Sequence, residues 1–161
     1  MKLRRYQKKD SKRIASWIQS ETQLYQWSAD RLEMFPLEED TLDSYYQEYA
    51  CETYIPLSLV DEEDVCAAHL FVRKVEEDIW RFGFVIVDPN RQKQGLGKEL
   101  LKQAIAYIQE KENPKKITLG VFTNNPNAYF LYKKMGFVDL EEISYDMKIG
   151  KWPCLEMEKV L

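Results

Sequence analysis

The fold is decided by residues 82–101, FGFVIVDPNRQKQGLGKELL. This stretch begins as an apolar run of strand length, breaks at Asp88-Pro89, passes through a basic and amide-rich turn with two glycines, and continues as an amphipathic helix. Backbone N–H groups in the first turn of a helix lack intrahelical partners and carry partial positive charge, so this layout suits a bound phosphate. The alternative is an ordinary connection in which the glycines only turn the chain.

The spacing of the glycines excludes two common phosphate-binding motifs. A P-loop needs a Gly-Lys-Ser/Thr ending and a dinucleotide-binding turn needs a third glycine, and neither is present in this stretch. The pattern Gln92-x-x-Gly95-x-Gly97, after a strand that ends Val-Asp-Pro, instead resembles the acetyl-CoA-binding motif of the GNAT superfamily of N-acetyltransferases. In that family the amides of the turn hold the pyrophosphate of coenzyme A.

Chain length, net charge and the number of cysteines exclude several other classes of protein. A chain of 161 residues fits one domain, expected over residues 1–161. A formal net charge of -4 argues against a nucleic-acid partner, since such binders need a basic surface. The charged start and the lack of a run of ~18 apolar residues favour a cytoplasmic protein with no membrane span. The three cysteines have no metal-ligand spacing, which indicates structural thiols and no metal site.

The first half of the chain predicts short helices followed by an antiparallel meander. The expected order is a strand at 2–6, a helix capped by Asp10 or Ser11, an aromatic-rich stretch at 21–35, a helix at 42–50 capped by Thr41, and strands at 53–60, 65–75 and from 79. Core packing is one explanation of the aromatic residues in these helices. Acceptor binding is the other, because helices at this place often contact the acceptor in the family that the glycine turn resembles.

The second half predicts a parallel crossover. Apolar positions on one side of a helix that ends near Asn113-Pro114 lead to a buried strand at 116–122. A strand, a helix and a strand form a right-handed unit, so the strands starting at 79 and 116 should be parallel neighbours. A closing hairpin is expected between a strand from Phe137 and one at 152–161.

A second motif covers residues 124–137, NNPNAYFLYKKMGF. Asn125 suits a helix N-cap with Pro126 at the first helical position, and Gly136 suits the C-terminal end. The order of asparagine, alanine, Leu-Tyr, lysine and Gly-Phe also resembles the second GNAT signature, with Tyr132 at the tyrosine position of the family. Both motifs together imply an α/β (α+β) fold of the GNAT type, with a mixed, mostly antiparallel sheet of about seven strands flanked by helices.

The resemblance implies a set of site residues and an acetyl-CoA co-substrate. Backbone groups of Val85, Ile86 and Val87 would pair with the pantetheine arm as an added strand, and Asn125 would contact the same arm. The pyrophosphate would be held by Gln92, Lys93, Gln94, Gly95, Leu96, Gly97 and Lys98. Tyr132 would face the sulfur and protonate the departing thiolate after a neutral amine attacks the thioester. The implied activity is therefore N-acetylation of a primary amine, on a small molecule or a peptide N-terminus.

The general base is where the sequence departs from the family pattern. Two positions that often hold a glutamate in the family are Gly83 and Gly120 in this chain. Two explanations of these glycines stay open, room for a bulky acceptor and close approach of neighbouring strands. A water chain, a tyrosine, a carboxylate of the helical insert or His69 could serve as base. His69 is titratable near neutrality, but a structural role is the stronger expectation.

Three function classes are compatible with the sequence. The first is the N-acetyltransferase, the second is a catalytically inactive acyl-CoA-binding regulatory protein, and the third is an interaction module that uses the aromatic helices. Retention of Tyr132 favours the first. Acidic stretches at 38–43, 61–64 and 139–142 would attract a cationic amine if they faced one cleft. In related enzymes the closing hairpin often lines the acceptor site and sometimes makes a homodimer contact.

Overall fold

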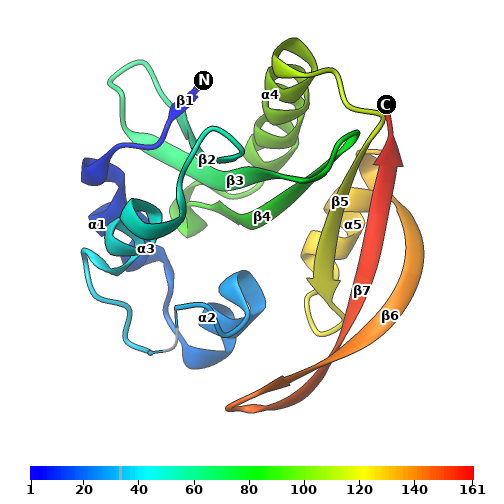
Figure 1. Cartoon of the computed structure of the whole chain (residues 1–161). Helices are drawn as coiled ribbons and strands as arrows, with labels where there is room; N and C mark the ends of the chain where they lie inside the picture. Colours follow the sequence, from blue (N-terminus) through cyan, green and yellow to red (C-terminus); the bar gives the residue numbers. More distant parts are fainter. Residues whose placement is uncertain (33) are drawn as a thin grey trace.

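The computed structural model describes residues 1–32 and 34–161, which form one seven-stranded sheet with helices on both faces (Figure 1). The strands are β1 (Lys2–Arg5), β2 (Tyr54–Val60), β3 (Cys66–Glu76), β4 (Ile79–Val87), β5 (Lys116–Phe122), β6 (Val138–Met147) and β7 (Gly150–Val160). The helices are α1 (Lys8–Trp17), α2 (Glu21–Ser28), α3 (Thr41–Tyr49), α4 (Leu96–Lys111) and α5 (Pro126–Lys134), and a 3-10 turn covers Pro89–Arg91. No helix within the described ranges is long and apolar enough to cross a membrane.

The sheet has the mixed topology that the sequence predicts. Its strand order is β1-β2-β3-β4-β5-β7-β6, and every neighbouring pair is antiparallel except β4 and β5. The parallel pairing of these two strands covers only Ile79 to Arg81, which lie opposite Lys116 to Thr118. Beyond Arg81 the two strands separate, and Figure 1 shows the opening between them. The predicted crossover and closing hairpin are both confirmed.

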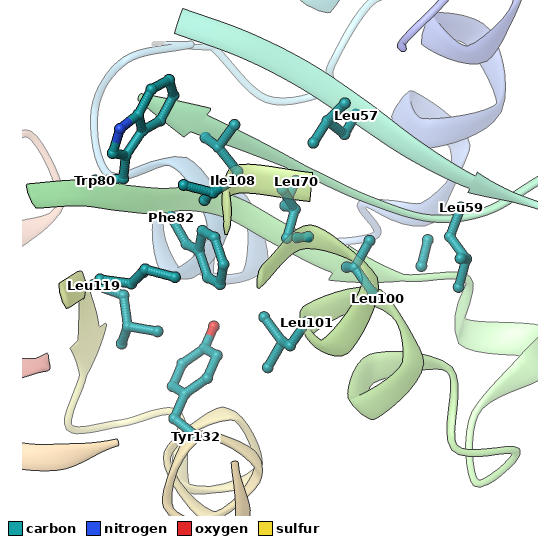
Figure 2. Close-up of a cluster of buried hydrophobic side chains, with 14 of the residues drawn as sticks. Leu57, Leu59, Leu70, Trp80, Phe82, Leu100, Leu101, Ile108, Leu119 and Tyr132 are labelled. Carbon is teal, nitrogen blue, oxygen red and sulfur yellow. The ribbon is translucent and has the colours of Figure 1, made fainter. Parts of the chain in front are cut away.

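Two apolar layers cover the two faces of the sheet. One layer combines the inner side of α4 with residues of β2 to β5 and with Tyr132 of α5 (Figure 2). The other layer packs α1, α2 and α3 against Phe71 of β3 and Phe84 of β4. Burial of these side chains supplies the main driving force for folding, at roughly 25 cal/mol per Å² of apolar surface. The opening between β4 and β5 therefore lies between two separately packed layers.

A β-bulge in strand β4, next to this opening, interrupts the alternation of its side chains between the two faces of the sheet. Phe71 of β3 lies opposite Gly83, whereas His69 lies opposite Ile86, so one residue of β3 faces two residues of β4. Phe84, one of these two, has a φ of 53°, in the left-handed region that a bulky residue rarely adopts. The bulge sends both Gly83 and Phe84 toward the face that carries α1 to α3. Sequence periodicity does not predict this change.

Two helix starts differ from the expected ones. Helix α1 begins at Lys8 with Gln7 as its N-cap, because Asp10 acts from the third helical position and accepts the backbone N–H of Gln7 at 2.9 Å. The prediction that Asp10 or Ser11 caps this helix was therefore wrong. Helix α3 begins at Thr41 itself, so the prediction of Thr41 as the cap was also wrong.

Candidate active site

The opening between β4 and β5 is a cleft of about 710 Å³ that passes from one face of the sheet to the other. The predicted site residues that line it are Val85, Ile86, Val87, Gln92, Lys93, Gly95, Leu96, Gly97, Lys98, Asn125 and Tyr132. Gln94, also predicted, lies exposed on the same turn. The structure thus brings the two sequence motifs to one cleft, although they come from segments about thirty residues apart.

The glycine turn forms the end of the cleft that suits a phosphate. Helix α4 begins at Leu96 after Gly95, whose φ of +74° is strained for any residue with a side chain. A Cβ at Gly95 would meet no described atom within 4 Å, so the space above this backbone is open. Gly97 serves packing, because a Cβ there would lie 2.9 Å from Leu131 of α5. The open N-terminus of α4 can therefore donate backbone N–H groups to an anion.

The basic side chains near this turn differ in whether their charge is already paired with a carboxylate. Arg91 forms an ion pair with Asp61 at 3.0 Å, so its charge is already matched. Lys93 and Lys98 line the cleft and add positive charge at the phosphate end. Two of the three basic side chains that the sequence places around the turn are therefore left for a bound anion.

The second half of β4 offers its backbone to the cleft. Within the described part of the chain, β4 pairs with β5 only as far as Arg81, whereas its pairing with β3 continues to Val87. Backbone groups of residues 82–87 on the β5 side are consequently open. An extended ligand arm can pair with them as an added strand, the mode expected for Val85, Ile86 and Val87.

Tyr132 enters the cleft from helix α5. Asn125 caps this helix by accepting the backbone N–H of Ala128 at 3.4 Å, as predicted, and Gly136 follows its end with a φ of +89°. The Tyr132 side chain is 5% exposed, and its hydroxyl points toward Phe82 (Figure 2). Burial raises the pKa of this phenol, so it stays protonated at neutral pH. A protonated hydroxyl that borders the cleft can act as a proton donor there.

The glycine at position 83 is explained by packing. A Cβ at Gly83 would overlap the Phe71 ring, with ring atom Cε1 at 2.6 Å. The ring occupies the space that a side chain of residue 83 would need, so this glycine leaves no room for a bulky acceptor. Close approach of neighbouring elements is the correct one of the two explanations here.

The glycine at position 120 faces an ion pair that sequence patterns do not reveal. A Cβ at Gly120 would lie 3.0 Å from Nη2 of Arg81 and 3.6 Å from Oε1 of Glu156. Arg81 donates two hydrogen bonds to Glu156, at 2.8 and 3.1 Å. The two residues are 75 positions apart on β4 and β7, and no local motif links them. A carboxylate therefore does stand beside Gly120, contributed by another strand.

His69 is part of the interior. Its side chain is completely buried, Nε2 lies 2.6 Å from the Tyr46 hydroxyl, and Nδ1 lies 3.3 Å from Oγ of Ser58. Burial lowers the pKa of this imidazole to about 3, so it is neutral at physiological pH. The expectation of a structural role is met, and His69 is set aside as the general base.

The aromatic helices divide between core and cleft. Leu42 and Tyr46 of α3 are buried in the layer that covers β3 and β4, as core packing predicts. Trp27 of α2 and Trp17 of α1 line the cleft. The described residues that line the cleft include none from the acidic stretches at 38–43, 61–64 and 139–142.

The structure shows no candidate metal centre within residues 1–32 and 34–161: no group of three or more histidine, cysteine or carboxylate side chains is placed to hold an ion. The residues that line the cleft include backbone donors, lysines, amides and a phenol. These groups suit a phosphate-bearing organic coenzyme.

Known proteins support the same assignment. A profile described as "Acetyltransferase (GNAT) family" matches residues 16–137. The spermine/spermidine N(1)-acetyltransferase of Bacillus subtilis strain 168 is 32% identical over 103 residues, which cover 60% of this chain and 67% of that protein. A probable spermine N(1)-acetyltransferase of Bacillus subtilis subsp. natto strain BEST195 matches with the same identity and coverage.

Solved structures share the fold over almost the whole chain. The spermidine N-acetyltransferase of Vibrio cholerae, crystallised in complex with CoA and spermine, superposes with a TM-score of 0.79 at 20% identity, covering 99% of this chain and 94% of that one. The profile covers most of the chain, and both sequence motifs meet in one cleft. The chain therefore belongs to the GNAT family of acetyltransferases, acyltransferases that use acetyl-CoA to acetylate primary amines.

Proposed function

We propose that this protein transfers the acetyl group of acetyl-CoA to a primary amine of a small polyamine such as spermidine or spermine. The observation that carries the proposal is the cleft between β4 and β5, which joins an anion-binding turn on one side to the face of α2 on the other. The polyamine class comes from the names of the Bacillus subtilis relatives, which are 32% identical to the matched part of the chain.

Coenzyme binding in this proposal is mainly the work of the backbone. The N–H groups from Gln92 through Lys98 hold the pyrophosphate at the start of α4, with Lys93 and Lys98 adding charge. The pantetheine arm pairs with the open edge of β4 at Val85 to Val87, and Asn125 contacts it from the other side of the cleft. The thioester then lies near the bulge of β4.

Tyr132 is the residue proposed for proton donation. A neutral amine attacks the thioester carbonyl, the C–S bond breaks, and the phenol protonates the departing thiolate. The acylated nitrogen then loses a proton to solvent, and the phenolate regains a proton from solvent. The pKa of a buried phenol lies above that of a thiol, so the advantage of Tyr132 comes from its position and not from a favourable pKa difference. Open N–H groups at the bulge would stabilise the developing oxyanion.

The test combines coenzyme binding with turnover. Calorimetry with acetyl-CoA, and with ATP as a comparison, should give saturable binding of acetyl-CoA at micromolar concentration and much weaker binding of ATP. Release of the CoA thiol should then depend on spermidine or spermine in a panel that includes a peptide with a free N-terminus.

Each failure of this test has a distinct meaning. Binding of acetyl-CoA without turnover on any amine would indicate the inactive coenzyme-binding protein. Absence of binding at millimolar acetyl-CoA would indicate an interaction module. Light scattering on the same sample tests whether the protein forms a homodimer, a contact that the closing hairpin makes in some related enzymes.

A further inference from the structure

Glu156 of β7 lies beside Gly120, a residue that lines the cleft, on the face of the sheet away from Tyr132. Gly120 lines the cleft, and Glu156 lies directly opposite it in the β5–β7 pairing. Side chains of directly opposite residues share one face of a sheet. Leu119 and Val121, the neighbours of Gly120, pack with Tyr132 in the layer on the other face. Glu156 and Tyr132 therefore approach the cleft from opposite faces of the sheet.

This arrangement places the departing thiolate and the incoming amine on opposite faces of the sheet. The thiolate leaves toward Tyr132 in the proposed mechanism, so the amine has to arrive from the other face. On that face the cleft is bordered by Trp27 of α2, the bulge residue Phe84 and Gly120. The missing side chain at Gly120 brings the Glu156 carboxylate to this border, within 3.6 Å of the point where a Cβ would lie.

On the β5–β7 side of Arg81, two carboxylates lie beside one guanidinium. Glu141 of β6 lies directly opposite Glu156 in the β6–β7 pairing, and like charges in such a pair are destabilising. Arg81 is the salt-bridge partner of Glu156, and its side chain is 20% exposed against 16% for Glu156. These charges leave the β5–β7 side of Arg81 negative, and this favours the approach of a cation from that side.

Other arginines limit where that cation can bind. Arg73 lies opposite Arg81 in the β3–β4 pairing, and Arg31 sits 5.9 Å above the Phe71 and Phe84 rings. These side chains repel an ammonium group on the β3 side of Arg81. The β5–β7 side, where Glu156 and Glu141 lie, is the side that attracts it.

We propose that Glu156, held in place by Arg81, binds the ammonium group of the acceptor and positions it at the mouth of the cleft. This inference rests on the proposed function only in taking the acceptor to be an amine. The bound ammonium is a nitrogen of the acceptor other than the neutral amine that attacks the thioester, so Glu156 acts as a positioning residue and not as the general base. Arg81 fixes the orientation of Glu156 with two hydrogen bonds.

The test compares two glutamates on the same strand. Glu156→Gln removes the charge and keeps the shape of the side chain. Glu158→Gln is the matched control, because Glu158 lies two positions further along β7 and forms an ion pair with Lys116 at 3.0 Å. Calorimetry of spermidine binding to protein saturated with CoA, in which no transfer can occur, measures the site without relying on turnover.

The expected result is selective loss of amine binding. Glu156→Gln should weaken spermidine binding by about tenfold or more, the loss typical of a charged hydrogen bond. The affinity for CoA should stay within about twofold, and Glu158→Gln should bind both ligands like the unmodified protein. With acetyl-CoA, the KM for spermidine should rise more than kcat falls.

A second variant guards against a folding artefact. Glu156→Gln leaves Arg81 without its carboxylate, so the double variant Arg81→Met with Glu156→Gln removes the unpaired charge as well. This variant should melt close to the Glu158→Gln control and still bind spermidine weakly. Recovery of full spermidine affinity in the double variant would overturn the proposal.

Three further outcomes would also overturn it. One is equal loss of spermidine affinity in Glu156→Gln and Glu158→Gln. Another is lack of spermidine binding by the unmodified protein while CoA binds. The third is tighter binding of lysine than of spermidine, which would mean that the arginines select a carboxylate-bearing acceptor. If spermidine binds as expected but no amine is acetylated, the proposed function fails and the assignment of Glu156 stands.

Discussion

The two halves of the cleft are built in different ways. The half proposed to bind the coenzyme, called the coenzyme half below, consists of backbone groups in two continuous segments. These are the open edge of β4 with the turn into α4, and the start of α5. The half proposed to receive the acceptor, the acceptor half, is lined by side chains of α1, α2 and β4 and by Gly120, and the pair of Glu156 and Arg81, 75 positions apart, lies beside Gly120. Recognition by backbone leaves a local pattern of glycines and caps in the sequence. Recognition by distant side chains leaves no such pattern.

This difference between the two halves explains why a sequence motif marks one of them and not the other. Glycine spacing is constrained in the coenzyme half because the backbone itself has to approach the ligand. The acceptor half can change its side chains without changing the backbone, since it rests on the same sheet. Four changes test this contrast, from the largest expected effect to the smallest.

The point where the two halves meet is the most sensitive to change. Gly83→Ala would push a Cβ into the buried Phe71 ring, so we expect it to lower the free energy of unfolding by about 3 kcal/mol. Gly120→Ala is the control, because its new Cβ would meet the movable ends of Arg81 and Cys154 at 3.0 and 3.1 Å. Urea denaturation should show a loss under about 1 kcal/mol for the control. Equal losses would show that the bulge is not rigid.

Removing the phenol of Tyr132 should separate catalysis from coenzyme binding. Tyr132→Phe keeps the packing in the buried layer, so we expect kcat to fall about a hundredfold while the Kd for acetyl-CoA hardly changes. Tyr129→Phe on the same helix removes an exposed hydroxyl that donates to Asp139, and should keep the activity. Assays of thiol release over time measure kcat for both variants, and calorimetry measures the Kd for acetyl-CoA. Unchanged turnover of Tyr132→Phe would remove this residue from the mechanism.

Acidification should weaken the layer beneath the acceptor half. The pKa of His69 is lowered by burial to about 3 in the folded protein, against ~6.5 in the unfolded chain. Between these values the unfolded chain binds a proton that the folded protein does not, so stability falls as the pH falls below ~6.5. From pH 7 to pH 5 this loss amounts to about 2 kcal/mol.

The control for this pH effect is His69→Gln, which cannot gain the proton. Its overall stability is lower, because the hydrogen bonds to Tyr46 and Ser58 change. Its stability should nevertheless vary much less between pH 7 and pH 5. Asp64, whose pKa is lowered to about 2 mainly by its hydrogen bond to Lys9, loses its contribution only at lower pH. A variant with the same pH dependence as the unmodified protein would assign the effect to other groups.

The smallest effect concerns the phosphate end of the coenzyme half. Gly95→Ala introduces strain at a φ of +74°, and we expect the Kd for acetyl-CoA to rise about tenfold as the turn relaxes. Gly150→Ala is a matched control, because Gly150 also has a positive φ and an open Cβ position within the described structure, but it is the first residue of β7. The control should lose stability and keep its coenzyme affinity. Similar Kd values for both variants would show that the glycine turn only redirects the chain.

Most of the fold could be predicted because its signals are local. Two β-rich runs separated by a polar turn indicated strands close to β2 and β3, and alternating apolar residues indicated β5. The crossover rule predicted the parallel pair of β4 and β5. The predicted N-cap of α1 was wrong because Asp10 lies within the helix. From there it accepts the backbone N–H of Gln7 and forms an ion pair with Arg4. A side chain with several tertiary partners is poorly described by local propensity.

The candidate site was predictable in one half only. The turn at 92–98, Asn125 and Tyr132 could be assigned because their motifs lie within single segments. The bulge at Phe84 could not, since a change of pleat is set by the neighbouring strand. Glu156 could not be found from the sequence either, because its relation to Gly120 exists only in the paired sheet.

The most direct measurement is the fate of the acetyl group. The protein is incubated with spermidine and acetyl-CoA that carries a labelled acetyl carbonyl, and the products are separated by mass spectrometry. We expect labelled N-acetylspermidine in the same amount as the CoA thiol released. Labelled acetate without any acetylated amine, or no thiol release with any amine of the panel, would contradict acetyl transfer through this cleft.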